Sequence, residues 1–288
     1  MKINFYLPDF YKNVKLIAFL ADLMVSTPEY FYENACISSV YGCFPGSIWN
    51  GGRVMLGSTT KQDIEYVLSE LNERGIAIRY TFTNPLIEDW HIFDTFCNLC
   101  LELAENDINE VLVNSPILED YIRKGYPKYK LISSTTKCLN DTASICDELK
   151  KDYKLVVLDS AMNNTEELFT LEPKDKIELI VNHYCADNCP KRREHYNSVG
   201  KSQLEFSETD FPVCKNINRD FFQIMKNRSF ITTEQLYGKY QEAGFCHFKL
   251  DGRAFRSYKV LESIVYYLVK PDWRDKVRQI ILKEVYKF

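Results

Sequence analysis

Short apolar runs and longer segments of helical spacing alternate along the whole chain. The runs are rich in β-branched and aromatic residues, as strands are, and lie at 2–7, 37–43, 76–82, 110–115, 130–136, 154–159, 176–182 and 247–252. Helical spacing of apolar residues is found at 11–26, 60–74, 89–105, 116–124, 140–151, 164–170, 233–243, 257–268 and 272–286. Eight strands alternating with helices predict a (β/α)8 barrel of the triosephosphate isomerase type.

A doubly wound open sheet is the main alternative fold. The chain has no G-x-G-x-x-G after its first strand and no Walker loop, so nothing in it favours that fold. We find no internal repeat or linker and expect residues 1–288 to form one barrel domain. One connection is unusually long, because the seventh and eighth strands are separated by an insertion at 183–246. Loops after strand ends form the active face of such a barrel, so the chemistry is expected there.

Composition excludes several classes of protein. The chain is globular, with 45% hydrophobic and 26% charged residues, and its net charge of -4 gives no general attraction to nucleic acid. Contact with RNA would depend on a local basic patch such as 191–193. The most apolar stretch, at 16–25, is too short to span a bilayer and no signal peptide is recognisable. We expect a soluble, cytoplasmic protein without membrane contact, whose 10 cysteines are reduced thiols.

Cysteines cluster in the insertion after the seventh strand. Cys185 and Cys189 are four residues apart, a spacing that places both thiols on one side of a helical turn, and Cys214 follows in the same insertion. Three thiolates suit a soft metal or an iron–sulfur cluster. Zinc held by these cysteines and His195 is an alternative, as is a peptidase thiol at Cys185 activated by His183 or His195. A packed, inert pair is the remaining interpretation, which the polar surroundings disfavour.

Charged residues at two strand ends are candidates for catalysis and substrate binding. His183 ends the seventh strand on the active side, where a general acid or base would lie, whereas His91 and His247 are expected to be structural. Lys249, Asp251 and Arg253 alternate along the end of the eighth strand, so two of them can face the barrel mouth. Arg253 can clamp a carboxylate, or else form an ion pair at the rim.

A second candidate for anion binding follows the second strand. Arg53 comes directly after Gly51 and Gly52 in the segment WNGGR. The two glycines either let the backbone approach a ligand or form a tight turn.

Several of these segments together resemble the collagenase-like peptidase family U32. They are SSVYGC at the second strand, STT after the fifth, VVLDSAMN after the sixth, IELIVNHYCADNC at the seventh and AGFCHFKLDGR at the eighth. The last two are the specific ones, because the family typically has E-x-F-x-H-G-x-x-C at strand seven and K-I-E-G-R at strand eight. Here Asn182 and His183 replace the family's His-Gly, and the eighth segment reads K-L-D-G-R.

The resemblance implies a redox enzyme. Family members hold a [4Fe-4S] cluster on four cysteines and hydroxylate transfer RNA, ribosomal RNA or the ubiquinone ring without dioxygen, apparently with oxygen from prephenate. Carried over, three cluster ligands fall on Cys185, Cys189 and Cys214. The family's D-L-C turn is replaced by Gln235, Leu236 and Tyr237, so the fourth ligand is Cys43, which we favour, Cys138, Cys246 or none.

We therefore expect oxygen-independent hydroxylation, or a related redox step, on an aromatic ring or RNA base. His183, Asp251 and Arg253 are the catalytic candidates, and Arg53 and Lys249 the substrate-binding ones. A thiol- or zinc-dependent peptidase is one alternative. A cluster-bearing, non-catalytic partner of a homologous subunit in a heterodimer is another.

Overall fold

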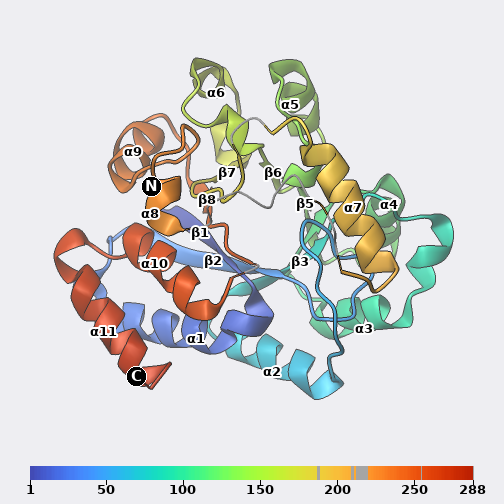
Figure 1. The fold of residues 1–288 in the computed structure, drawn as a ribbon, viewed down its shortest axis with the longest axis horizontal. Coiled ribbons are helices and arrows are strands. Elements are labelled where there is room, and N and C mark those ends of the chain that lie inside the picture. The colour runs from blue at the N-terminus through green and yellow to red at the C-terminus, as the bar shows by residue number, and fades with distance from the viewer. Residues whose placement is uncertain (187–188, 209–210, 212–219, 254, 288) are drawn as a thin grey trace.

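The strands form a closed parallel barrel in a computed structural model that describes all residues except 187–188, 209–210, 212–219, 254 and 288. Each strand pairs with the next in the chain, and β8 closes the barrel on β1 (Figure 1). The strands are β1 (Ile3–Pro8), β2 (Ala35–Gly42), β3 (Ala77–Phe82), β4 (Glu110–Val113), β5 (Lys130–Ser133), β6 (Leu155–Val157), β7 (Ile177–Ile180) and β8 (His247–Lys249). The predicted (β/α)8 barrel is thus confirmed.

Helices surround the barrel and mostly coincide with the predicted segments (Figure 1). They are α1 (Phe10–Ser26), α2 (Lys61–Asn72), α3 (Thr95–Ala104), α4 (Pro116–Gly125), α5 (Thr142–Leu149), α6 (Glu166–Thr170), α7 (Arg192–Leu204), α8 (Phe221–Ile224), α9 (Thr233–Gln235), α10 (Ser257–Leu268) and α11 (Arg274–Glu284). Side-chain caps fix several starts: Ser115 accepts a hydrogen bond from Leu118 N and Asp141 from Ser144 N. A π-helical turn at Leu236–Tyr240 extends α9, and short 3-10 turns occur at Pro28–Tyr30, Asp89–Phe93, Thr135–Lys137, Ser160–Met162, Lys174–Lys176 and Pro271–Trp273.

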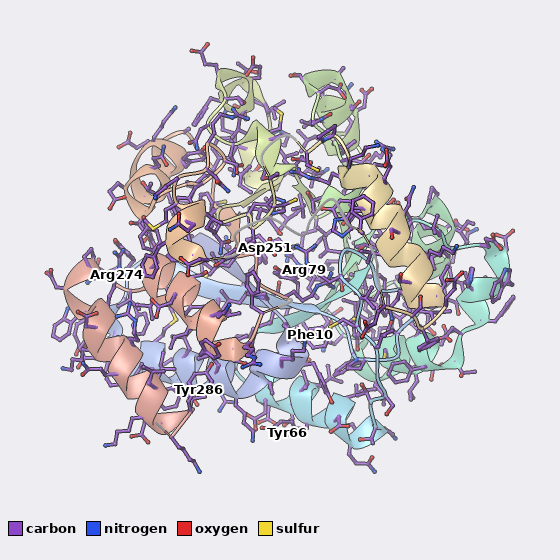
Figure 2. All side chains as sticks on the ribbon, viewed as in Figure 1. Phe10, Tyr66, Arg79, Asp251, Arg274 and Tyr286 are labelled. Atoms are coloured by element: carbon purple, nitrogen blue, oxygen red, sulfur yellow. The ribbon has the colours of Figure 1, made fainter. Side chains whose placement is uncertain are left out.

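The barrel interior combines apolar side chains with a buried ion cluster. Tyr6, Tyr41, Leu112, Ile132, Leu155, Val157 and Ile180 form its apolar part. At its centre Arg79 donates hydrogen bonds to Glu110 at 2.6 Å and to Glu178 at 2.5 Å (Figure 2). All three side chains are withdrawn from solvent. The low dielectric there strengthens the ion pairs, and breaking one of them exposes the full cost of a buried charge.

Helix α7 crosses the carboxyl ends of the strands and was not predicted. Gln203 accepts a hydrogen bond from Met55 N at 2.8 Å, and Asn84 donates one to Gly200 O at 3.0 Å, so the helix is tied to the loops after β2 and β3. Among its buried positions, 192, 196, 199, 200 and 203 have helical spacing. Several of them are polar, and a search for apolar periodicity therefore missed the helix.

Two cysteines of the insertion precede α7. Cys185 and Cys189 are both outside any helix, so the predicted helical turn that would place their thiols side by side is wrong at these residues. In the part of the chain that the structure describes, no helix combines the length and apolarity needed to cross a bilayer.

Glycine at position 51 is required by close packing of two loops, which supports the tight-turn interpretation of WNGG. A Cβ atom there would lie 2.4 Å from the backbone oxygen of Thr83. We expect Gly51→Ala to lower the free energy of unfolding by about 1–3 kcal/mol, since backbone atoms must move to admit the methyl group. The matched control is Gly125→Ala, where a Cβ meets nothing within 4 Å. Urea unfolding measures both, and equal stability of the two variants would contradict this packing.

Candidate functional site

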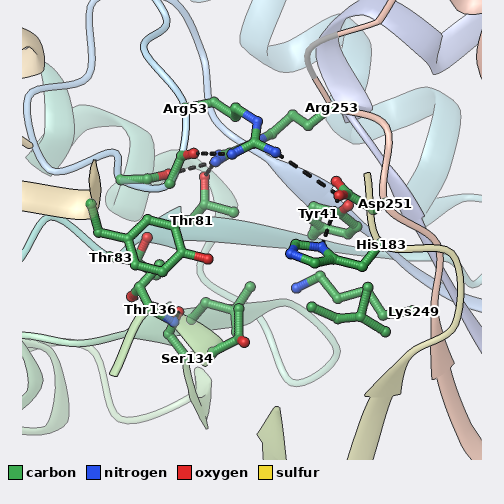
Figure 3. Close-up of a pocket in the computed structure, with 16 residues that line it drawn as sticks. Tyr41, Arg53, Thr81, Thr83, Ser134, Thr136, His183, Lys249, Asp251 and Arg253 are labelled. Atoms are coloured by element: carbon green, nitrogen blue, oxygen red, sulfur yellow. Dashed lines mark hydrogen bonds and ion pairs between the residues drawn. The ribbon is translucent and has the colours of Figure 1, made fainter. Parts of the chain in front are cut away.

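A cavity of about 70 Å³ opens among the loops that follow the strands (Figure 3). That volume holds a few water molecules or part of a small ligand. The charged or titratable side chains lining it come from the loops after β2 and β7 and from the region of β8: Arg53, His183, Lys249, Asp251 and Arg253. Hydroxyl groups line the remaining wall, from Tyr41, Thr81, Thr83, Ser134, Thr135, Thr136 and Tyr196. Five loops, those after β2, β3, β5, β7 and β8, thus converge with helix α7 on one polar site at the active end of the barrel.

Asp251 accepts hydrogen bonds at both of its carboxylate oxygens. Gly252 N donates to Oδ1 at 2.8 Å, Tyr184 N donates to Oδ2 at 3.3 Å, and the Nδ1 atom of His183 lies 3.2 Å from Oδ2. The guanidinium of Arg53 is 3.9 Å from Oδ2. Burial alone would raise the pKa of Asp251, but the hydrogen bond from His183 and the charge of Arg53 hold it well below the usual range. Asp251 is therefore an ionised carboxylate that fixes the histidine.

His183 also interacts with the Cys185 thiol. Burial lowers the pKa of His183, but its hydrogen bonds with Asp251 and Cys185 outweigh this and raise the pKa to about 9. The pKa of Cys185 is lowered although burial raises it, because the hydrogen bond with His183 and the nearby positive charges favour the thiolate. The structure therefore brings Cys185, His183 and Asp251 into one connected group.

Arg253 is engaged by neutral groups and is not an open clamp. Its Nη1 donates to Asn50 Oδ1 at 2.8 Å and to the Thr81 hydroxyl, and its Nη2 donates to Gly51 O at 2.5 Å. Among the described residues no carboxylate lies within ion-pair distance of this guanidinium. Arg253 therefore holds the turn at 50–53 in place and leaves a positive charge beside the cavity.

Lys249 reaches the cavity from the last residue of β8. Its Nζ lies 3.7 Å from Glu178 Oε1 and 4.0 Å from the centre of the Tyr41 ring. Burial, together with the charges of Arg79 and Arg253, lowers the pKa of Lys249 to about 8 against the opposing effects of Glu178 and Asp251. Arg79 also binds Glu178, so the carboxylate nearest to Lys249 is shared between two positively charged side chains.

The predicted metal ligands are only partly within the described chain. Cys185 and Cys189 are partly exposed on the loop after β7, whereas the predicted third ligand, Cys214, lies outside the described residues. Cys43 is fully buried, and burial raises its pKa to about 12. The residues that the structure describes contain no group of three His, Cys, Asp or Glu side chains able to hold a metal ion. Metal binding by Cys185, Cys189, Cys214 and Cys43 therefore stays a prediction.

The alternative fourth ligands lie at opposite ends of the barrel. Cys138 follows β5, and burial and the charge of Asp159 raise the pKa of its thiol against the opposing charges of Arg193 and Arg192 at the start of α7. Cys246 is buried just before β8, near Cys36, at the amino end of the strands as expected. The ring of His195, proposed for zinc, stacks on Phe211 with centroids 4.8 Å apart.

The two histidines expected to be structural have structural contacts. His91 accepts a hydrogen bond from Glu88 N at 2.9 Å, and His247 is 2.6 Å from the Tyr6 hydroxyl at the amino end of β8. Sequence reasoning did not assign roles to the cavity hydroxyls of Ser134, Thr136 and Tyr196. For the first two, the S-T-T segment after β5 was the available signal.

Comparison with known proteins supports the fold. No family model and no curated protein matches the chain. The solved structure of the U32 peptidase Mk0906 superposes with a TM-score of 0.55 and covers 88% of this chain and 93% of that one, at 13% sequence identity. At this identity the likeness shows a common fold and leaves activity to be argued from the site. The chain thus has the barrel fold of a U32 peptidase, which confirms the predicted resemblance at the level of the fold.

Proposed function

We propose that this chain is an iron–sulfur enzyme of the U32 type. It binds a small carboxylate at the barrel mouth and carries out oxygen-independent hydroxylation, or a related redox step, on an aromatic ring or RNA base. One observation carries the proposal: the cavity holds an excess of buried positive charge next to the loop of Cys185 and Cys189.

The charge excess follows from the lining residues. Arg53, Lys249 and Arg253 face a single lining carboxylate, Asp251, among the residues that the structure describes. Glu178, beneath them, is shared between Lys249 and Arg79. Buried charges without partners cost free energy, and a bound anion would offset that cost. A cavity of this kind is suited to a carboxylate or phosphate ligand.

The cluster that the resemblance implies has part of its donor set in place. We propose Cys185, Cys189 and Cys214 as ligands, and Cys185 has the lowered pKa that a thiolate ligand requires. Burial raises the pKa of both Cys43 and Cys138, and ligands must be deprotonated; Cys43, which is fully buried with a pKa of about 12, suits a fourth position less well. Cys138 or an open position is the alternative. When bound, the cluster would supply one-electron chemistry at iron.

The remaining cavity residues have roles that follow from their contacts. Arg53 donates one hydrogen bond, to Gly52 O, and so has more free N–H groups than Arg253 with which to bind the anion. Its ion pair with Asp251 orients the guanidinium. His183, held by Asp251, moves a proton at its Nε2 atom. Arg253 supports the turn that carries Arg53.

A thiol hydrolase is a second candidate, which the connected group of Cys185, His183 and Asp251 favours. A cysteine whose base is oriented by a carboxylate is the arrangement of thiol peptidases. In that case the purified protein would cleave peptides without iron or sulfide, and Cys185→Ala would abolish cleavage. A heterodimer with a homologous subunit, the third proposal, would be seen as co-purification of that subunit.

Binding of prephenate, the anion implied by the resemblance, tests the cavity directly. Calorimetric titration is expected to show binding to the wild type and a weakening of about tenfold or more in Arg53→Gln, since a charged hydrogen-bonding partner contributes roughly 1.5–3 kcal/mol. Arg74→Gln is the matched control, because Arg74 pairs with Asp22 on the outer surface. Absence of binding, or equal binding by both variants, would contradict the proposed anion site.

A further inference from the structure

Lys249 is a buried amine at the centre of a solvent-connected cavity. The residue is 6% exposed, and its side chain extends into the cavity below the imidazole of His183, facing the side where Ser134 and Thr136 lie (Figure 3). No hydrogen bond from its Nζ is found to any described residue, and the nearest carboxylate oxygen is 3.7 Å away. The amine is therefore held in position and is directed at whatever occupies the cavity.

Charged and polar groups from several strands surround this amine. Glu178 faces it from β7, Arg79 from β3, Tyr41 from β2, and Arg253 and Asp251 from the loop after β8. The two arginines oppose protonation, and burial does so more strongly. At neutral pH roughly a tenth of the amine is unprotonated, against well under a hundredth for an ordinary lysine. An unprotonated lysine amine is a nucleophile toward carbonyl carbon.

We propose that Lys249 forms an imine with a carbonyl-bearing carboxylic acid bound in the cavity. The carboxylate is held by Arg53, which places the carbonyl carbon near Nζ. The amine nitrogen forms a bond to that carbon, and the carbonyl oxygen leaves as water with the two amine protons. The sum is amine plus carbonyl giving imine plus water, with no oxidant or reductant. The inference rests on the proposed anion site, but not on the cluster.

The geometry favours this role over a purely structural one for three reasons. Glu178 has its close ion pair with Arg79 at 2.5 Å, whereas Lys249 lies 3.7 Å from the other carboxylate oxygen and forms no hydrogen bond with it. The amine lines the cavity, where a structural lysine would turn its charge to solvent or to a close carboxylate. The hydroxyl groups of Ser134 and Thr136 lie on the opposite wall, where they can form hydrogen bonds with the carbonyl oxygen of the substrate.

Reductive trapping with pyruvate as the probe tests the proposal. The full chain is incubated with pyruvate and cyanoborohydride, and intact mass and peptide mapping locate the product. We expect one carboxyethyl group per chain, at Lys249, formed at least about ten times faster at pH 7 than at exposed lysines. The initial rate should rise by about tenfold from pH 6 to pH 7. Lactate, which has no carbonyl group, should leave the protein unlabelled.

Variants at position 249 distinguish the reactivity of the amine from the effect of its positive charge. Lys249→Arg keeps the charge and should abolish the specific label, and Lys249→Met does the same if the arginine variant fails to fold. Lys150→Arg is the matched control, since Lys150 is exposed and pairs with Asp147 on α5, and should label like the wild type. Labelling of Lys249 no faster than that of Lys150 would overturn the inference. If the protein binds prephenate but Lys249 is not labelled, the imine proposal fails and the anion site is still supported. If iron-free protein is labelled at Lys249, imine formation does not depend on the cluster.

Discussion

Replacing Arg79 by methionine is expected to destabilise the protein by about 3–5 kcal/mol, because it leaves buried carboxylates without their partner. Arg79 is the only described side chain that binds both Glu110 and Glu178. Lys154 still contacts Glu110, but Glu178 retains only Lys249 at 3.7 Å. The free energy of unfolding is measured by urea denaturation followed by circular dichroism.

The same substitution on the outer surface provides the control. Arg74 forms ion pairs with Asp22 and Glu70 on exposed helices, so Arg74→Met should cost at most about 1 kcal/mol. If Arg79→Met were as stable as this control, the carboxylates inside the barrel would have to be protonated or hydrated. Either state would contradict the buried ion cluster of Arg79, Glu110 and Glu178.

Changing Asp251 to asparagine is expected to cost roughly 3 kcal/mol, although the side chain keeps its shape. All neighbours of the carboxylate donate: Gly252 N to Oδ1, and Tyr184 N with His183 to Oδ2. Either orientation of an asparagine amide sets its NH2 group against a donor. His183 loses its orientation at the same time, so turnover should fall more than stability alone explains.

Asp94→Asn is the matched control for that substitution. Asp94 caps α3 by accepting a hydrogen bond from Cys97 N at 2.7 Å, and asparagine caps a helix equally well. Its free energy of unfolding in urea should therefore stay within about a few tenths of a kcal/mol of that of the wild type. A similar, small effect at position 251 would mean that the carboxylate network does not hold the histidine.

The fold could be predicted because the strands are buried on both faces and the helices on one. Segments such as β3 and β4 are continuously buried, which matches their mainly apolar sequence, interrupted by Arg79, Thr81 and Glu110. Helix α7 could not be found in this way. It docks through Arg192, Gly200 and Gln203, which carry no apolar signal, and the contacts that make it helical are made with loops distant in sequence.

Parts of the candidate site follow from position alone. His183, Lys249, Asp251 and Arg253 lie at strand ends, and the barrel brings such ends together at one face. Their partners depend on side-chain geometry that a sequence does not contain. The expected carboxylate clamp at Arg253 is instead bound to Asn50, Thr81 and Gly51, and the favoured ligand Cys43 is buried away from solvent.

Iron and acid-labile sulfide in protein purified without oxygen test the central proposal most directly. We expect both in similar amounts in the wild type, with visible absorption, and a loss of most of each in Cys185→Ser and Cys189→Ser. Cys146→Ser, at a partly exposed thiol on α5, should retain the wild-type content. A colourless wild-type protein without iron or sulfide would contradict the account.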